Sequence, residues 1–327
     1  MRPFDYQRAG DEAQALAAGG KYLAGGTNLI DLMRLDVERP ERVTDITRLP
    51  LRDVQDVGGG LRIGALASNT AVAEHPLVRE RYPLLSDAIR AGASQQIRNM
   101  ASMSGNVMQR TRCPYFRNLD FAACNKRDPG SGCGAIMGDH RKHAVLGGSE
   151  CCIAVHASDA AVPLVALDCT LTLHGPDGER EVALTDFLLK PEHHPDLEHD
   201  LRPGELIVAL NLPALPWAVN STYIKVRERE SYSFALASAA VAVDLDGDTI
   251  RAARIALGGV GTVPWRARAA EEALRGQPAS PDAFREAARL ALQDAQPLAQ
   301  NAYKVGLGQS VVVRALERVT KKNEEEA

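Results

Sequence analysis

The chain has 327 residues, of which 45% are hydrophobic and only 5% aromatic, and it carries a net charge of −4 with a pI near 6.1. A chain of this length can bury sizeable cores, and we expect two or three domains. The mildly acidic balance gives no electrostatic case for nucleic acid as a partner. The longest apolar stretch, at 234–243, is too short for a bilayer span, so we expect no membrane insertion. The N-terminal residues lack the apolar core of a signal peptide, so export would need a partner.

The first fifty residues predict a strand, a helix, a second strand and a glycine turn. A short strand is expected at 3–6, a helix from Asp11 and a strand at 21–24. The turn Gly25-Gly26-Thr27-Asn28 then leads into an apolar helix. Glycines let the backbone approach a pyrophosphate, and amides at a helix N-terminus favour negative charge. The alternative is a tight left-handed turn without a ligand. No Rossmann or Walker lysine motif appears in this context, so a nicotinamide-binding domain is not expected.

The middle of the chain alternates between strand and helix patterns. A hairpin with a glycine turn is expected over 51–68, followed by helices over 69–78 and 84–94. A second glycine turn, Ser104-Gly105-Asn106, could pass its backbone close to the same ligand. Further on we expect a helix-to-strand passage, a hairpin turning at 176–178 and a strand within 201–213. His193, His194 and His199 lie in an acidic, proline-flanked segment, where solvation is more typical than metal binding.

The C-terminal third predicts an antiparallel sheet followed by helices. Strand patterns begin after Trp217 and turn at Asp246-Gly247-Asp248. Helices are expected within 265–276 and 281–295, then a final helix over 305–322. The terminal residues 323–327, NEEEA, are expected to be a disordered, solvated tail.

Five of the six cysteines lie within the 40 residues from Cys113 to Cys152. The spacing from Cys113 to Cys124, Cys133 and Cys152 is C-x10-C-x8-C-x18-C, without the C-x2-C pair of zinc ribbons or ferredoxins. The intervening residues, rich in Pro, Gly, Ser and Asn, suit a long irregular loop whose amides can donate to cluster sulfurs. A metal or cluster is favoured over free thiols or disulfides. Cys169, in an apolar run, is expected to be a buried small hydrophobic residue.

Several segments together resemble one known family. They are LAGGTNL at 23–29, GLRIGALAS at 60–68, IRNMASMSGNV at 97–107, HASD at 156–159, YIKVRERESYSFALASAAV at 223–241 and ALGGVGTVPWRA at 256–267. In this order they resemble the FAD-binding medium subunit of the molybdenum hydroxylases, the relatives of xanthine dehydrogenase and carbon monoxide dehydrogenase.

The resemblance implies an α+β fold. It combines a two-lobed FAD-binding domain of the vanillyl-alcohol-oxidase (PCMH) type with a C-terminal α+β domain of the CO dehydrogenase flavoprotein type, a three-stranded antiparallel sheet with helices. The implied boundaries are a first sublobe at 1–55, a second at 56–216 with a cluster loop at 110–155, and the C-terminal domain at 217–322.

Within the family, a 4Fe-4S insertion occurs in the periplasmic aldehyde oxidoreductase and, with different spacing, in 4-hydroxybenzoyl-CoA reductase. QRTRCPYF, CNKRDPGSGC and SECCIAVHASD resemble the aldehyde oxidoreductase insertion. This resemblance implies Cys113, Cys124, Cys133 and Cys152 as cluster ligands. The pair Cys151/Cys152 is ambiguous because the family has one cysteine there, and we favour Cys152 because it keeps register with HASD.

The resemblance also implies a set of FAD-binding residues. Ala24 to Leu29 match the pyrophosphate loop, and Lys225 matches a lysine that contacts FAD; the alternative for Lys225 is a solvated lysine on a strand edge. A cation near the cofactor would stabilise phosphate or anionic reduced flavin. The full set is Lys21, Ala24, Gly25, Gly26, Thr27, Asn28, Leu29, Ser104, Gly105, Asn106, Met108, Ser158, Asp159, Leu206 and Lys225.

The function implied by the resemblance is electron transfer within a complex. A large subunit with molybdopterin would oxidise an aldehyde, a small subunit would carry 2Fe-2S clusters, and this chain would pass electrons from FAD to an external acceptor. The chain has no plant-type C-x4-C-x2-C run and shows no resemblance to the molybdopterin subunit, so no catalytic residue of the substrate reaction is expected here.

Several alternatives remain open at this stage. They are a medium subunit like that of 4-hydroxybenzoyl-CoA reductase or xanthine dehydrogenase, a stand-alone flavin oxidase, and a non-redox subunit stapled by zinc. The resemblance suggests a periplasmic location through co-export with a partner bearing a twin-arginine signal. The lack of a leader fits the cytoplasm.

Overall fold

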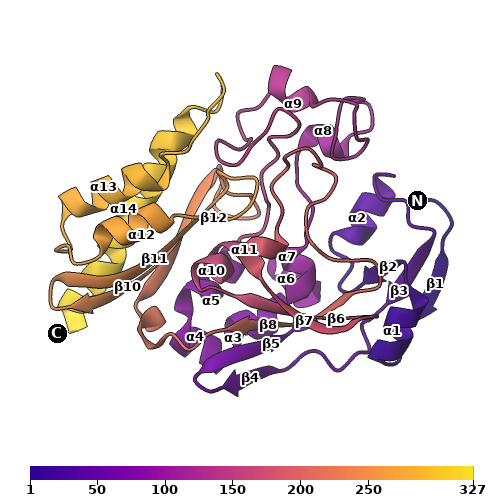
Figure 1. The fold of residues 1–327 in the computed structure, drawn as a ribbon, viewed down its shortest axis with the longest axis horizontal. Helices are drawn as coiled ribbons and strands as arrows, with labels where there is room; N and C mark the ends of the chain where they lie inside the picture. Colours follow the sequence, from indigo (N-terminus) through magenta and orange to yellow (C-terminus); the bar gives the residue numbers. More distant parts are fainter. Residues whose placement is uncertain (327) are drawn as a thin grey trace.

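In the described part of the chain the strands form three sheets, which are seen from right to left in Figure 1. The computed structural model describes the backbone of residues 1–326 and the side chains of residues 1–321. The first sheet is parallel, in the order β1-β3-β2. The Asp11 side chain accepts a hydrogen bond of 2.8 Å from Gln14 N and so caps the first helix, whose start near Asp11 the sequence predicts. This lobe contains β1 (Asp5–Arg8), α1 (Glu12–Ala18), β2 (Lys21–Leu23), α2 (Leu29–Arg34) and β3 (Arg42–Asp45).

The second sheet is antiparallel and joins segments far apart in the sequence. Its order is β4-β5-β8-β6-β7, and Leu61 of β5 pairs with Leu212 of β8. Both hairpins predicted for this region, with turns near 58–59 and 176–177, are confirmed. The strands are β4 (Val54–Val57), β5 (Gly60–Gly64), β6 (Thr170–Gly175), β7 (Gly178–Ala183) and β8 (Leu206–Leu212).

Short helices connect the strands of this second sheet. The helix predicted over 69–78 is split, because His75, which precedes Pro76, has an extended backbone. The turn predicted at Ser104-Gly105-Asn106 is wrong: these residues are helical, and the Ser102 hydroxyl caps them by accepting from Gly105 N at 3.2 Å. The helices are α3 (Asn69–Glu74), α4 (Pro76–Arg81), α5 (Pro83–Ala91), α6 (Gln95–Met100), α7 (Met103–Val107), α10 (Ala161–Ala166) and α11 (Leu184–Phe187).

The cysteine-containing segment lies at the top of the view in Figure 1 and has little regular structure. It contains two single-turn helices, α8 (Pro114–Arg117) and α9 (Gly134–Met137). Side chains supply much of its hydrogen bonding. The Arg127 guanidinium donates to the carbonyls of Tyr115 and Phe116 at 2.8 and 3.0 Å. The irregular loop expected from the composition is therefore present, and side-chain bonds to its backbone hold it in shape.

The third sheet is antiparallel, with helices packed against one face (Figure 1). Its order is β12-β11-β10-β9, so the three predicted strands are confirmed and a two-residue strand extends them. The elements are η1 (Pro216–Val219), β9 (Ser221–Val226), β10 (Ala237–Asp246), β11 (Thr249–Gly258), β12 (Trp265–Arg266), α12 (Arg268–Leu274), α13 (Pro281–Ala291) and α14 (Tyr303–Glu326). The side chains of the tail predicted at 323–327, and the whole of residue 327, lie outside the described residues.

The β10 strand is buried on both of its faces. Ala237, Ala239 and Val241 belong to the core under α12, α13 and α14, whereas Ala240 belongs to the core of the second lobe. Small side chains on alternate positions let a helical layer approach each face closely. Cys169 is 1% exposed in the second lobe's core, as predicted. None of the described helices is both long and apolar enough to cross a membrane.

Candidate functional site

A cleft of about 1020 Å³ opens where the three parts of the chain meet. Each part contributes residues that the sequence singles out. They are Thr27 and Asn28 from the first lobe, Gly105, Asn106, Ser158 and Asp159 from the second, and Lys225 from the third. The cleft therefore brings together seven predicted cofactor-binding positions that are spread over about 200 residues of sequence.

The glycine turn before α2 is packed tightly against the second lobe. A Cβ on Gly25 would lie 1.8 Å from the Met100 carbonyl oxygen, and Gly26 has a φ of 73°. Neither position accepts a side chain without strain. Asn28 Oδ1 accepts from Arg110 N at 3.1 Å, whereas Asn28 Nδ2 is buried without a partner among the described residues. An unpartnered amide donor on the cleft wall fits an acceptor-rich group such as a phosphate.

Lys225 points into the cleft region and pairs with the aspartate of the HASD segment. Its Nζ lies 2.7 Å from Asp159 Oδ2, and Tyr223 OH donates to Asp159 Oδ1 at 2.7 Å. The Lys225 side chain is only 3% exposed, so the alternative of a solvated lysine is wrong although β9 is an edge strand. Burial, with the Asp159 charge nearby, raises the pKa of Tyr223 well above its usual value. At neutral pH Tyr223 is therefore a hydroxyl donor.

Ser158 and Asn106 form a second polar pair on the cleft wall. The Ser158 hydroxyl donates to Asn106 Oδ1 at 2.6 Å and accepts from Ala161 N at 2.9 Å. His156, two residues earlier, is half-buried, and desolvation lowers its pKa to about 4. The HASD segment therefore presents neutral groups to the cleft apart from the Asp159 carboxylate, whose charge is balanced by Lys225.

The remaining predicted residues do not line the cleft. Lys21 is exposed, with Nζ 3.8 Å from Glu38, and the Ser104 hydroxyl donates to the Ala65 carbonyl at 2.9 Å. Leu206 is buried in the core beside the first lobe. Gly25 and Gly26 lie in the turn and Ala24 and Leu29 on either side of it, and Met108 faces a separate small pocket.

The sequence reasoning overlooked a segment at 227–236 that lines the cleft. Its Phe234 ring is half exposed and lies 5.3 Å from the Arg112 guanidinium. Burial lowers the pKa of Arg112 to about 10, so it remains a cation at neutral pH. Tyr232 has a φ of 53°, a rare conformation for an aromatic residue. The signal that could have revealed this segment is the pair of aromatic residues in the charged run RERESYSF.

Five cysteines line one small cavity beside the cleft. They are Cys113, Cys124, Cys133, Cys151 and Cys152, and none of them forms a disulfide. Cys124 and Cys133 pair through an isolated antiparallel bridge. Burial raises the pKa of Cys113 to about 12 and that of Cys152 to about 11. The buried thiols would ionise at neutral pH only beside a strong positive charge such as a metal.

Both adjacent cysteines line the cavity, but Cys152 is buried whereas Cys151 is partly exposed. Cys133 and Cys124 add to the raised pKa of Cys152, so these three thiols lie close together. The Cys151 carbonyl accepts from Asn125 Nδ2 at 3.0 Å, which fixes the backbone between the pair. Among the described residues, no group of three or more His, Cys, Asp or Glu side chains converges on a single metal ion. A multi-iron cluster differs in being held by thiolates around its periphery.

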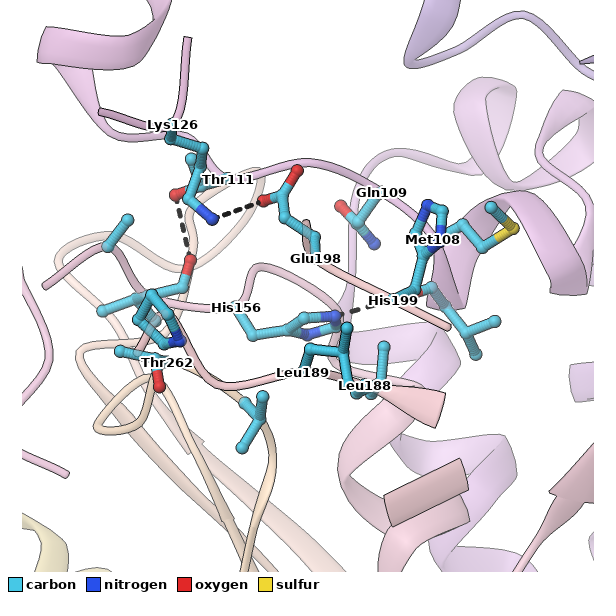
Figure 2. A pocket seen from close by; sticks show the side chains of 15 residues that line it. Met108, Gln109, Thr111, Lys126, His156, Leu188, Leu189, Glu198, His199 and Thr262 are labelled. Carbon is cyan, nitrogen blue, oxygen red and sulfur yellow. Dashed lines mark hydrogen bonds and ion pairs between the residues drawn. The ribbon is translucent and has the colours of Figure 1, made fainter. Parts of the chain in front are cut away.

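A small pocket, whose side chains are drawn in Figure 2, shares lining residues with both the cleft and the cysteine cavity. Lys126 Nζ lies 3.1 Å from Glu198 Oε1, and Arg110 pairs with both Glu198 and Glu38. Burial opposes ionisation of Glu198, but the charges of Lys126 and Arg110 outweigh it and hold the pKa of Glu198 below its usual range. His199 stacks on Phe187 at 5.5 Å, so it is not the solvated histidine that the sequence predicts, whereas His193 and His194 are exposed.

The fold and the cleft define a two-lobed cofactor-binding protein with a helix-covered C-terminal domain. Residues 2–215 match the family "FAD binding domain in molybdopterin dehydrogenase", and residues 222–319 match "CO dehydrogenase flavoprotein C-terminal domain". The chain therefore belongs to the FAD-binding medium subunits of the molybdenum hydroxylase family, an oxidoreductase family. The predicted family and fold class are confirmed.

Individual relatives agree with this membership. The chain is 44% identical over 324 residues to the aldehyde oxidoreductase FAD-binding subunit PaoB of Escherichia coli, covering 97% of this chain and 98% of that one. It is 26% identical to the carbon monoxide dehydrogenase medium chain of Hydrogenophaga pseudoflava, over 92% and 89%. The solved carbon monoxide dehydrogenase of Hydrogenophaga pseudoflava superposes with a TM-score of 0.74 at 26% identity, covering 97% and 98%. Quinoline 2-oxidoreductase of Pseudomonas putida 86 shares the fold, with a TM-score of 0.75 at 21% identity over 98% of each chain.

Proposed function

We propose that the chain is the FAD- and 4Fe-4S-containing electron-transfer subunit of a heterotrimeric, molybdenum-dependent aldehyde oxidoreductase. It would take electrons from a 2Fe-2S small subunit, itself served by a molybdopterin-binding large subunit, and pass them to an external acceptor. Identity of 44% along nearly the whole chain to a subunit named for aldehyde oxidation supports the substrate class. The convergence of five cysteines on one buried cavity is the observation that carries the cluster assignment.

The residues of the cleft have distinct parts in binding FAD. The turn at Gly25-Gly26 brings the backbone to the cleft, and Asn28 Nδ2 offers a free donor for a phosphate oxygen. Asp159 is held by Lys225 and Tyr223, so its position is fixed before a ligand arrives. When bound, FAD accepts electrons singly from iron–sulfur donors and gives them to an acceptor.

The thiols would bind the cluster through Cys113, Cys124, Cys133 and Cys152. Cys113 also lines the flavin cleft, so a cluster bound through it would border the flavin. Lys126 lines the cysteine cavity and its charge lowers the pKa of Cys152, against the larger effect of burial. This cation would partly balance the negative charge of four thiolates.

Anaerobic EPR of the dithionite-reduced chain, with flavin and iron quantified in the same sample, tests the proposal. We expect stoichiometric FAD beside a reduced 4Fe-4S signal. Cys152→Ser should lose the iron, whereas the matched Cys151→Ser variant should keep it. FAD without iron would overturn the cluster assignment. Zinc in place of iron would mean that the cysteine loop holds a structural metal. Aldehyde oxidation by the isolated chain would favour a stand-alone oxidase.

We also propose that the chain acts in the periplasm after folded co-export with a partner bearing a twin-arginine signal. The likeness to aldehyde oxidoreductase supports this location, and a cytoplasmic enzyme is the alternative. Cell fractionation with and without the partner's signal distinguishes them: the chain should leave the periplasmic fraction when only the partner's twin arginines are replaced.

A further inference from the structure

A histidine lies against one of the predicted cluster ligands. His143 Nε2 is 3.2 Å from Cys113 Sγ, within hydrogen-bonding distance for sulfur. Cys113 lines both the cysteine cavity and the flavin cleft, and His143 lines the cleft. The contact between these two residues therefore sits where the two cavities adjoin.

The polar surroundings of His143 leave its ring few other partners. The residue is 5% exposed, and its Nδ1 is buried without a hydrogen-bond partner among the described residues. Its nearest aromatic neighbour is Tyr115, with ring centroids 6.1 Å apart. The Cys113 sulfur is thus the acceptor to which an Nε2–H can donate, and a buried N–H normally has a hydrogen-bond acceptor.

The C-terminal domain fixes the backbone that carries this ring. Lys304 is fully buried at the start of α14, and its Nζ donates to the carbonyls of Lys142, His143 and Gly259 at 2.9, 3.1 and 2.6 Å. Asn301 Nδ2 donates to the carbonyl of Ala144 at 3.1 Å. Asn301, just before α14, and Lys304, in its first turn, therefore hold the backbone of segment 142–144 in place. Such support around a ligand is typical of groups that tune a metal site.

We propose that His143 is a positioning residue that donates a hydrogen bond from Nε2 to the Cys113 thiolate and raises the reduction potential of the 4Fe-4S cluster. This inference rests on the proposed cluster. Reduction adds negative charge to the cluster and its sulfurs, so a donor at a ligating sulfur stabilises the reduced form more than the oxidised form. Because Cys113 borders the cleft, the bond would act on the part of the cluster that faces the flavin.

EPR-monitored redox titration of the full-length chain tests this role without relying on turnover. His143→Phe removes the donor, and we expect the oxidised form to be favoured about tenfold, a fall of about 59 mV for one electron. His143→Gln keeps an N–H donor and should retain most of the potential. His140→Gln is the matched control, because this buried histidine of the same loop bonds to Gln300 and not to a thiol.

The outcomes separate this inference from the proposed function. A wild-type chain without iron would overturn both. A cluster whose potential is the same in the wild type and in His143→Phe would overturn the role of His143 alone. If the variants do not take up iron, the wild type labelled with ¹⁵N-histidine decides: a weak nitrogen coupling in pulsed EPR is expected. No coupling, or the strong coupling of a directly ligated imidazole, would overturn the hydrogen bond.

Discussion

The flavin cleft and the cysteine loop are neighbouring sites built in opposite ways. The cleft walls come from three lobes, and the Asp159 carboxylate on them is already paired with Lys225. The loop has two single-turn helices, and burial raises the pKa values of its Cys113 and Cys152 thiols. The cleft is therefore fixed by packing before its ligand binds, whereas the loop is expected to depend on its ligand and on a few side-chain bonds.

The largest effect should come from the backbone approach that shapes the cleft. In Gly25→Ala the new Cβ would lie 1.8 Å from the Met100 carbonyl oxygen, so the first lobe must shift. We expect a loss of about 3 kcal/mol or more in the free energy of unfolding, and loss of FAD. Urea unfolding and flavin absorbance would measure both.

The matched glycine is Gly306 in α14, where a Cβ meets no atom within 4 Å. Gly306→Ala should be neutral or stabilise by up to about 1 kcal/mol. Equal stability of the Gly25→Ala and Gly306→Ala variants would contradict the tight packing of the turn.

The paired charge in the cleft gives the next effect. Lys225→Met leaves Asp159 with Tyr223 as its side-chain partner, and we expect a loss of about 3 kcal/mol together with a lower FAD content. Adding Asp159→Asn removes the carboxylate that Lys225→Met leaves without its cation. The double variant should therefore regain part of the free energy of unfolding but not the FAD. Full FAD content in the single variant would show that Lys225 does not serve the cofactor.

The cysteine loop should respond to loss of a side chain that bonds its backbone. Asn125 Oδ1 accepts from Gly130 N and Gly132 N at 3.1 and 2.8 Å, and its Nδ2 donates to the Cys151 carbonyl. We expect Asn125→Ala to cost about 2 kcal/mol and to lower the iron content while FAD is retained.

Asn118→Ala is the control within the same loop, because its exposed side chain accepts one local bond from Asp120 N. Its cost should be below about 1 kcal/mol, with iron unchanged. Parallel loss of iron and FAD in Asn125→Ala would contradict the independence of the two sites.

The smallest effect is expected at a joint between the first two lobes, away from the cysteines. Burial lowers the pKa of His174, but its bonds to Glu12 and Glu179, at 2.6 and 2.8 Å, outweigh this effect and raise the pKa above its usual value. The folded state then binds more protons, so the stabilisation is complete below about pH 6.5 and is lost as the pH rises through the raised pKa.

His174→Gln removes this effect and should destabilise by less than about 1 kcal/mol at pH 5.5, because the pair is partly exposed. At pH 8.5 the variant and the wild type should be nearly equal. Thermal unfolding at the two pH values measures this, and the same difference at both would rule out the ion pair as its cause.

Local sequence signals predicted the elements well where short-range chemistry decides them. Asp11 caps α1, and the hairpin turns fall where glycine-containing pairs stand in the sequence. The signal failed at Ser104-Gly105-Asn106, where the glycine suggested a turn but Ser102 caps a helix. A glycine shows where a turn is allowed, whereas the cap and the packing of the second lobe determine that a helix forms.

The site was predictable as a set of segments but not as a set of contacts. A solvated Lys225 stayed open as an alternative because its partner Asp159 lies 66 positions away, and His199 was predicted to be solvated because the sequence does not place Phe187 beside it. The aromatic residues at 232–234 lie in a segment that carries the family resemblance, but no binding role was predicted for them, so their position on the cleft was missed.

The sequence by itself determined the hairpins, the C-terminal helices, the glycine turn before α2 and the concentration of five thiols in 40 residues, since all of these depend on neighbours along the chain. The tertiary structure alone decided that Asp159 is neutralised by Lys225, that the thiols share one cavity, and that His143 meets Cys113. These contacts depend on how the three sheets pack against one another. That packing is determined by the burial of side chains that are far apart in the sequence, and no local sequence pattern shows it.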